Sequence, residues 1–191
     1  MKEKLKNLSI AIRLLILGVV IFSLAYSGII GIIGQTLWTN SADGSLIRQE
    51  GEIIGSQLIG QKFENPKLFH GRPSSINYNA TQSGSQNLAP NNPILTDRVK
   101  KTLNKISENR TIDNLTVPPD LVTESGSALD PHITTRSALF QIPRISKNTG
   151  IPEDKLRTIV EKYSQDKLLG LYGIQRVNIL ELNLEIKKII E

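Results

Sequence analysis

The first 37 residues carry the strongest hydrophobic pattern of the chain. Residues 14–37 include no charged side chain, and as an α-helix they would span about 36 Å at ~1.5 Å per residue. Such a helix crosses a hydrocarbon core and satisfies its own backbone groups in one pass. Basic residues precede it, as is typical of a cytoplasmic flank. We therefore expect a cytoplasmic N-terminus (1–13), a transmembrane helix (14–37) and an extracytoplasmic domain (38–191).

A cleaved signal peptide is the alternative interpretation of this segment. The tripeptide Ala25-Tyr26-Ser27 resembles a small-x-small cleavage site. However, the apolar run continues about ten residues beyond it and exceeds the usual length of about 7–15 residues for the apolar region of a signal peptide. The pattern therefore favours a retained anchor in the bilayer.

Small residues recur at four-residue spacing within the predicted span. Ser23, Ser27 and Gly31 would share one helical face. Small side chains allow two helices to approach closely in lipid, where apolar burial alone gives no preference for association. Glycine is also frequent in membrane helices for no specific reason. We predict that this face packs against a partner helix.

The pattern after residue 38 predicts a single mixed α/β domain. Apolar pairs at 53–54 and 58–59 indicate short extended segments broken by Gly55 and Gly60. Apolar spacing close to 3.6 residues, together with capping residues, predicts helices from Asn92 to Ile106, from about Thr134 to Gly150, and from Pro152 to Tyr163. Pro143 is expected to kink or split the second of these helices.

Two stretches of this domain have weaker signals. Residues 70–92 are rich in Ser, Asn, Gly and Pro without either period, and so long an irregular stretch in a compact domain is usually functional or disordered. Residues 177–186 mostly alternate apolar and polar side chains, which predicts a half-buried strand. A helix through Leu180, Leu184 and Ile189 is the alternative.

The charge distribution argues against nucleic acid as a partner. The formal net charge is +5, from 23 basic and 18 acidic residues. Residues 1–13 hold four of the basic and one of the acidic residues, which leaves 19 against 17, or only +2, for the rest. Nucleic-acid binding requires a dense basic face, and no such run is visible.

Catalytic and metal-binding motifs are missing from the sequence. There is no cysteine, and no H-E-x-x-H, phosphate-binding G-x-x-x-x-G-K-[ST] or nucleophile G-x-S-x-G motif occurs. Ser127, Asp130 and His132 lie near one another, but a triad needs geometry that sequence proximity does not supply. We predict no catalytic residue, no cofactor and no metal site.

Seven sequence blocks in a fixed order carry a family resemblance. They are GSLI (44–47), GSQLIGQ (55–61), FHGRPS (69–74), SQNLA (85–89) before Asn92-Pro93, LVT (121–123) leading into SGSALDPHI (125–133), QIPRI (141–145) and VNILELNL (177–184). Behind one N-terminal span, they make the chain resemble the C subunit of Kdp potassium-transporting P-type ATPases along nearly its whole length. Ala128 stands where many family members have glycine, in a stretch once likened to a nucleotide-contacting signature of ABC transporters.

The resemblance implies a non-catalytic accessory subunit. Its partners would be a channel-like potassium-binding subunit, an ATP-hydrolysing P-type subunit and a small single-span subunit, besides the lipid bilayer. The family is also described as a chaperone that raises the ATP affinity of the hydrolysing subunit, but the predicted topology puts this domain on the side opposite ATP. Assembly and stabilisation of the complex, with cover for the outer potassium entrance, fit the topology better.

Two loops are the candidate docking surface for these partners. The residues are His70, Gly71 and Arg72 in one loop and Ser125, Gly126 and Asp130 in the other. An anchored extracytoplasmic binding or sensor module, working without a pump, is the alternative function. An anchored hydrolase is a third class, which would require a convergent nucleophile or acid/base group.

Overall fold

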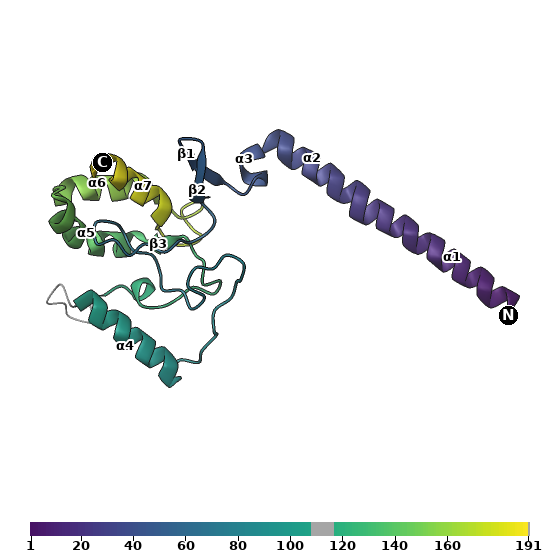
Figure 1. The fold of residues 1–191 in the computed structure, drawn as a ribbon, viewed down its shortest axis with the longest axis horizontal. Coiled ribbons are helices and arrows are strands. Elements are labelled where there is room, and N and C mark those ends of the chain that lie inside the picture. The colour runs from purple at the N-terminus through teal and green to yellow at the C-terminus, as the bar shows by residue number, and fades with distance from the viewer. Residues whose placement is uncertain (108–116, 191) are drawn as a thin grey trace. The chain divides into compact units, whose positions relative to one another are not determined.

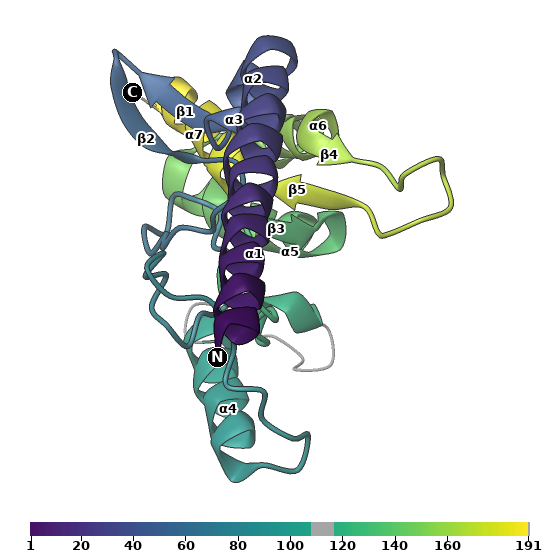
Figure 2. The same cartoon turned by 90° about the vertical axis from the view of Figure 1, so that its right-hand side faces the viewer.

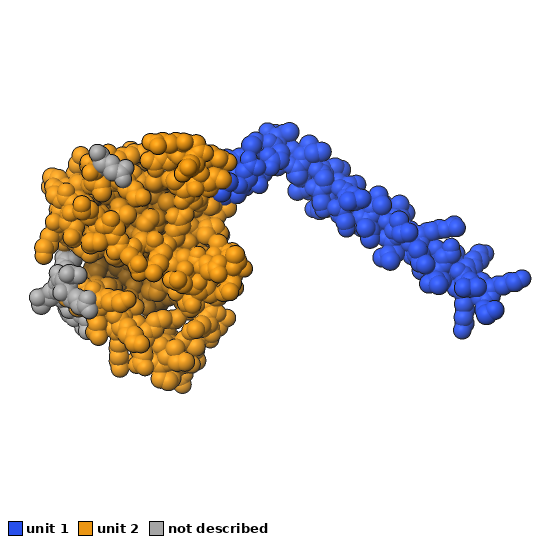
Figure 3. All heavy atoms as spheres, viewed as in Figure 1, with its two compact units in different colours: residues 1–46 blue, residues 47–191 orange. Residues whose placement is uncertain are grey.

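The computed structural model describes residues 1–107 and 117–190, and the chain divides into two compact units. Unit 1 comprises residues 1–46 and unit 2 comprises residues 47–191 (Figure 3).

Unit 1 is dominated by one continuous helical run from Lys2 to Leu37. It consists of α1 (Lys2–Val19), a π-helical segment (Val20–Tyr26) and α2 (Ser27–Leu37), and the short helix α3 (Thr39–Ala42) follows. The run has 36 residues with a mean hydropathy of 2.5 in its most apolar window, and no residue of that window is buried. This confirms a helix that is long and apolar enough to cross a membrane.

The helix begins twelve residues earlier than the predicted span, at Lys2 rather than residue 14. Residues 2–13 (KEKLKNLSIAIR) contain neither Pro nor Gly, so no strong helix breaker opposes helix formation there. At about 1.5 Å per residue the whole run extends over about 54 Å, which is longer than a hydrocarbon core of about 30 Å.

The described residues form two small antiparallel sheets, and the first strand begins at the last residue of unit 1. Strands β1 (Leu46–Gln49) and β2 (Glu52–Ser56) pair around a tight turn, in which Glu50 and Gly51 both have positive φ angles of 52° and 87°. The second sheet has the order β3-β5-β4, formed by His132–Thr134, Arg176–Asn178 and Ser164–Gln165. Val177 at its centre pairs with Ile133 on one side and Ser164 on the other.

Three helices pack around the second sheet. They are α5 (Thr135–Thr149), α6 (Glu153–Tyr163) and α7 (Ile179–Ile190), and Figure 1 shows them gathered on one side of unit 2, with α4 (Pro93–Ser107) on the other. A short 3-10 helix (Pro119–Leu121) leads to the second sheet. The core centres on side chains without exposed surface, including Phe69, Ile142, Ile145, Leu156, Val160, Val177, Leu182 and Ile186.

Local capping explains why the predicted helices form where they do. Asn92 Oδ1 accepts the N–H of Ile94 at 2.9 Å, with Pro93 as the first helical residue of α4. Thr134 caps α5 by accepting the N–H of Ser137 at 3.1 Å. Gly150 ends α5 in the left-handed conformation at φ 78°. The three helix predictions, including the third as α6, are confirmed.

The strand predicted over residues 177–186 is wrong, and its helical alternative is right. Only Arg176–Asn178 is a strand, and α7 follows at once. The side chain of Asn178 caps this helix, since its Oδ1 accepts the N–H groups of Leu180 at 3.0 Å and Glu181 at 3.3 Å. The apparent alternation arises because α7 buries a wide apolar face against the core.

Three smaller expectations also need correction. Pro143 lies inside α5, so the predicted split is wrong, whereas a kink stays a prediction. The 58–59 pair lies in a turn instead of an extended segment. Gly55 does not break β2 but lies within it. A larger residue does not fit at this position, because a Cβ would collide with the side chains of Gln61 and Leu180. Glycine at this position permits close packing of β2 on its neighbours.

Candidate functional site

The long irregular stretch is held to the helices by buried side-chain amides. No helix or strand is assigned within residues 57–92, yet Phe69 is fully buried. The N–H of Phe69 donates to Asn183 Oδ1 at 2.7 Å, and Asn183 Nδ2 donates back to the Phe69 carbonyl at 2.9 Å. The amide of Asn183 on α7 thus replaces the strand partner that this backbone lacks.

His70 is held in the same way from another helix. Its N–H donates to Gln141 Oε1 at 2.8 Å, and Gln141 Nε2 donates to the His70 carbonyl at 3.0 Å. The ring Nε2 lies 3.1 Å from the carbonyl oxygen of Asn65. Burial, with a further contribution from the nearby charge of Arg144, lowers the pKa of His70 below its ordinary value. The backbone of His70 is therefore committed to contacts within unit 2.

Arg144 completes this support from α5. Its guanidinium donates to the carbonyls of Pro66 and Leu68, the latter at 2.9 Å, and to Gln141 Oε1 at 2.7 Å. Burial lowers the pKa of Arg144 to about 10, which leaves it charged at neutral pH. The turn over residues 65–70 is thus fixed by a cation that has three acceptors.

The two predicted docking loops meet at Arg72. Its guanidinium donates to the carbonyl oxygens of Thr123 at 3.3 Å and Glu124 at 3.0 Å, and it lies 3.5 Å from Asp130 Oδ2. Arg98 on α4 reaches the same region, with its Nη1 2.9 Å from Glu124 Oε1. We refer to Arg72, Arg98, Glu124 and Asp130 as the Arg72 cluster.

The two acids of the Arg72 cluster are stabilised in their charged form. The side chain of Glu124 is only 7% exposed, and it accepts the N–H of Ser75 at 2.9 Å. Burial alone would raise its pKa, but the hydrogen bonds from Ser75 and Arg98 outweigh burial and lower the pKa. The pKa of Asp130 is lowered in the same manner, since the hydrogen bonds from His132 outweigh burial.

Backbone contacts fix the second docking loop. The carbonyls of Gly126 and Ser127 each accept an N–H at 2.9 Å, from Ser85 and Gly84 respectively. Asp130 N–H lies 3.4 Å from Ser125 Oγ. Gly126 is exposed whereas Ser125 is buried. The structure thus brings together Arg72, Ser125 and Asp130, leaves His70 and Gly71 half-buried, and exposes Gly126 at the surface.

Ala128 has a backbone conformation that favours glycine. Its φ angle is 58°, in the left-handed region that glycine adopts more readily than alanine. The Ala128 side chain is also 2% exposed. A glycine at this position would therefore be explained by the backbone conformation of the loop, without any contact with a nucleotide.

The small residues of the helical run divide between two kinds of helix. Ser27 and Gly31 both lie in α2, four residues apart on one face. Ser23 lies in the π-helical segment, whose turns close over more residues. A Cβ at Gly31 would meet no atom of the chain within 4 Å, so this face is open to another helix. The place of Ser23 on that face stays a prediction.

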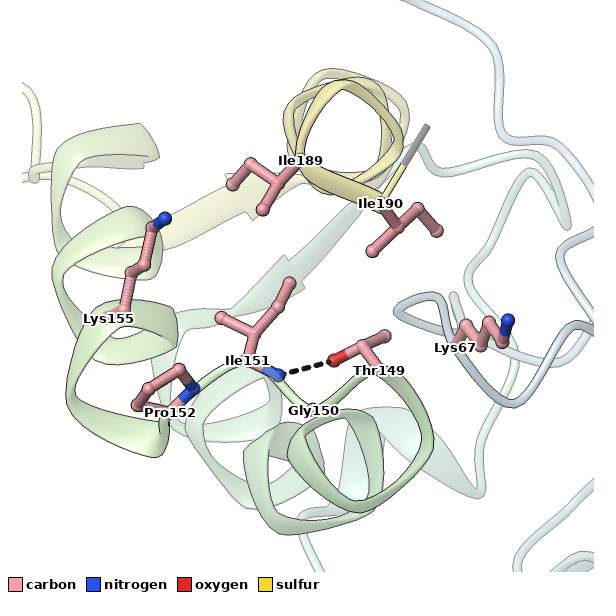
Figure 4. A pocket seen from close by; sticks show the side chains of 8 residues that line it. All are labelled: Lys67, Thr149, Gly150, Ile151, Pro152, Lys155, Ile189 and Ile190. Carbon is pink, nitrogen blue, oxygen red and sulfur yellow. Dashed lines mark hydrogen bonds between the residues drawn. The ribbon is translucent and has the colours of Figure 1, made fainter.

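Two of the surface hollows in the described part of unit 2 are lined in part by basic and apolar side chains. One, of about 420 Å³, lies between α5, α6 and α7, with Lys67 and Lys155 on opposite sides of Ile151, Ile189 and Ile190 (Figure 4). The other, of about 490 Å³, runs along α4 past Arg98, Lys101 and Lys105. Within residues 1–107 and 117–190, no three His, Asp or Glu side chains are grouped to hold a metal ion.

Sequence reasoning missed the residues that position the first docking loop. Asn183, Gln141 and Arg144 lie in two of the blocks that carried the family resemblance, but nothing in those blocks indicates that their side chains bind backbone more than 70 residues away. The N-cap of α7 did have a signal, because Asn178 is followed by Glu181 three residues later.

Comparison with known proteins agrees with the sequence blocks. The family model described as "K+-transporting ATPase, c chain" matches residues 8–188. The chain is 46% identical over 193 residues to the potassium-transporting ATPase KdpC subunit of Bacillus mycoides, and 45% identical to that of Bacillus cereus strain ATCC 10987. The KdpC subunit of Bacillus cytotoxicus is 44% identical over 192 residues. These alignments cover the whole of both chains, so the chain belongs to the family of K+-transporting ATPase c chains, the KdpC subunits.

Proposed function

We propose that the chain is a non-catalytic accessory subunit of an ATP-driven potassium uptake complex, which it assembles and stabilises. The full-length similarity to KdpC subunits of potassium-transporting ATPases carries this proposal. The sequence contains no Asp-Lys-Thr-Gly phosphorylation motif and no phosphate-binding loop, so ATP hydrolysis falls to another subunit.

The partners are a channel-like potassium-binding subunit, an ATP-hydrolysing P-type subunit and a small single-span subunit. The chain enters the complex as a single-pass protein of the cell membrane, with residues 1–13 in the cytoplasm and unit 2 outside. The basic flank of the helix supports this orientation. On that side unit 2 is suited to cover the outer entrance of the potassium pathway. A direct effect on ATP affinity fits this placement poorly, because ATP is bound on the cytoplasmic side.

Two surfaces are proposed to hold the complex together. Within the bilayer, the face of Ser27 and Gly31, with Ser23 before it, packs against a partner helix. Outside, the Arg72 cluster and the exposed Gly126 form the docking surface for a partner loop. Asn183, Gln141 and Arg144 hold the backbone of the first loop, and the N–H groups of Gly84 and Ser85 hold the second. This support favours docking over a flexible role, because a preformed surface loses little entropy on binding.

Growth at limiting potassium tests the function. In a host that depends on this pump, deletion of the gene should abolish growth, and restoring the full chain should recover it. A version without residues 1–37 should restore growth poorly, because the anchor raises the local concentration of unit 2 near its partners. Normal growth after deletion, together with a pump that purifies intact and active, would contradict the proposal and favour an anchored binding module.

Co-purification tests the helix face separately. We expect Gly31→Leu to reduce recovery of the other subunits in detergent, because the added side chain prevents close approach of two helices. Ile30→Leu is the matched control, since it places leucine at the neighbouring position without altering the small-residue face. Unchanged recovery with Gly31→Leu would exclude packing on this face and leave the accessory function itself intact.

A further inference from the structure

The loop between β4 and β5 is an exposed apolar hairpin. Every residue from Gln165 to Arg176 is exposed, and the loop extends away from the rest of unit 2 in Figure 2. Its large apolar side chains are far more exposed than those of the core. They are Leu168 (70%), Leu169 (82%), Leu171 (77%), Tyr172 (68%) and Ile174 (59%). So dense an apolar group at one protruding tip marks an interaction site.

The hairpin has a defined backbone. Leu168 and Tyr172 exchange two hydrogen bonds, with Leu168 N–H donating at 2.9 Å and Tyr172 N–H donating at 3.0 Å. Leu169 and Gly170 turn through positive φ angles of 53° and 71°. At its base, Gln175 Nε2 donates to Asp166 Oδ1 at 2.6 Å. The tip is therefore a structured turn that presents apolar side chains while its central backbone groups are paired.

Charged side chains flank the tip of the hairpin, whereas the tip itself has none. Residues 168–175 include no ionisable group except the tyrosine, whereas Lys167 and Arg176 flank them as exposed cations. Asp166 is the single acid in the segment 162–176. An apolar tip with a tyrosine and a cationic base matches the layers of a lipid–water interface, where aromatic rings and Lys or Arg face the headgroups.

The connection to the membrane helix keeps this hairpin near a bilayer. Only residues 38–46 join Leu37 to unit 2, and nine residues extend at most about 30 Å. A unit of 145 residues (47–191) has a radius of gyration of about 15 Å. Any face of unit 2 can therefore reach the membrane surface, where anionic lipids would attract the cationic base.

We infer that the 166–175 hairpin docks into the outer lipid–water interface and holds unit 2 against the membrane. This rests on the part of the proposed function that places residues 14–37 in the bilayer with unit 2 outside. The apolar side chains enter the interfacial layer and the cations at the base contact lipid phosphates. Docking limits how unit 2 can turn about its anchor, which orients it toward its partners before assembly.

Single-cysteine labelling tests the inference, because the natural chain has no cysteine. Leu171→Cys, and Lys101→Cys on α4 as the control position, are labelled with nitrobenzoxadiazole in the full chain. Each is placed in lipid nanodiscs without other subunits. We expect nitroxide lipids to quench the dye at 171 and shift its emission to the blue, with neither change at 101. Adding phosphatidylglycerol to phosphatidylcholine should strengthen quenching, and Lys167→Gln should remove that increase.

Variants of the tip provide the matched comparison. With the dye at Ile174→Cys, the pair Leu169→Ser and Leu171→Ser should abolish quenching, whereas Leu171→Ile should retain it. These side chains contact little of unit 2, so folding should be unaffected. A dye at 171 that stays in water with the chain alone but becomes shielded in the purified complex would overturn lipid docking in favour of a protein partner. A dye at 171 that stays exposed to water both in the chain alone and in the complex would also overturn lipid docking. Equal quenching at 171 and 101 would overturn it as well. Co-purification of the pump subunits is measured separately, so lipid docking and the proposed accessory function can each be contradicted without the other.

Discussion

The N-terminal helical run and unit 2 differ in how far their apolar residues are buried. Along Lys2–Leu37 no residue is buried by the chain, and Phe22 and Leu15 are 71% and 67% exposed. In unit 2, residues such as Ile142 and Leu156 have no exposed surface. Burial of a leucine or isoleucine side chain stabilises a fold by about 1.5–3 kcal/mol. Unit 2 gains this stabilisation internally, whereas the helix can gain it only from lipid or another chain.

The contrast also distinguishes residues that stabilise unit 2 from residues that are available for contact with other chains. Contacts that hold unit 2 together, such as the pairing of Asn183 with Phe69, are internal to it. The helix, the exposed residues of the second docking loop and the hairpin at 166–175 do not contribute side chains to the core. We therefore expect substitutions in the first group to unfold unit 2 and substitutions in the second group to spare the fold.

The largest expected effect follows removal of residues 1–37. The remaining chain should lose its stable anchor, with only the weaker contact of the 166–175 hairpin to lipid left, yet still fold, because the apolar core lies in unit 2. Membrane fractionation measures the first outcome, and a cooperative thermal transition followed by circular dichroism measures the second. The full chain in detergent is the control. A truncated chain that lacks a cooperative transition would show that unit 2 depends on the helix for folding.

Loss of a buried amide should have the next largest effect. Asn183→Ala leaves the N–H and carbonyl of Phe69 buried without partners, at about 1–3 kcal/mol for each group. The free energy of unfolding should therefore fall by about 2–6 kcal/mol, measured by urea denaturation of the 38–191 chain. Asn148→Ala is the control, because Asn148 is exposed near the end of α5 and bonds only the Arg144 carbonyl. Equal losses from both variants would refute a special role for Asn183.

Local signals predicted much of unit 2, and their physical basis explains both success and failure. Asn92, Thr134 and Gly150 satisfy backbone groups within a few residues, so their effect is visible in sequence. The prediction of a strand over the start of α7 was wrong because the apolar residues from Val177 to Ile186 also fit a two-residue period. Gly55 was misread because the reason for glycine there is the packing of Leu180, far along the chain.

The candidate site was predicted only as far as the family resemblance reached. It identified the blocks around Arg72 and Asp130, which the structure brings within 3.5 Å. It gave no indication that Arg98 on α4 joins them, or that Gln141 and Asn183 hold the adjacent backbone. Those contacts depend on tertiary packing and leave no local pattern. The hairpin at 166–175 was likewise passed over, since exposure of apolar residues is not visible before the fold is known.

A smaller effect is expected where two loops touch closely. In Gly60→Ala the new Cβ would lie 2.8 Å from the Asp130 carbonyl oxygen and 3.0 Å from that of Leu129. Backbone must shift to relieve this contact, so the free energy of unfolding should fall by about 1–3 kcal/mol. In the control, Gly126→Ala, the Cβ would meet no atom within 4 Å. If Gly126→Ala instead weakens co-purification at full stability, Gly126 belongs to the docking surface.

The smallest expected effect concerns pH, and it tests whether the Arg72 cluster stabilises unit 2. Hydrogen bonds lower the pKa values of Glu124 and Asp130 in the folded state. Their contribution is therefore present above the unfolded values of about 4 and is lost as pH falls through the folded values. We expect the free energy of unfolding of the 38–191 chain to fall by about 1–2 kcal/mol on acidification from pH 5 to about pH 3. Glu124→Gln should lose less over the same interval, because its amide does not titrate, and an unchanged slope would place the acid sensitivity elsewhere.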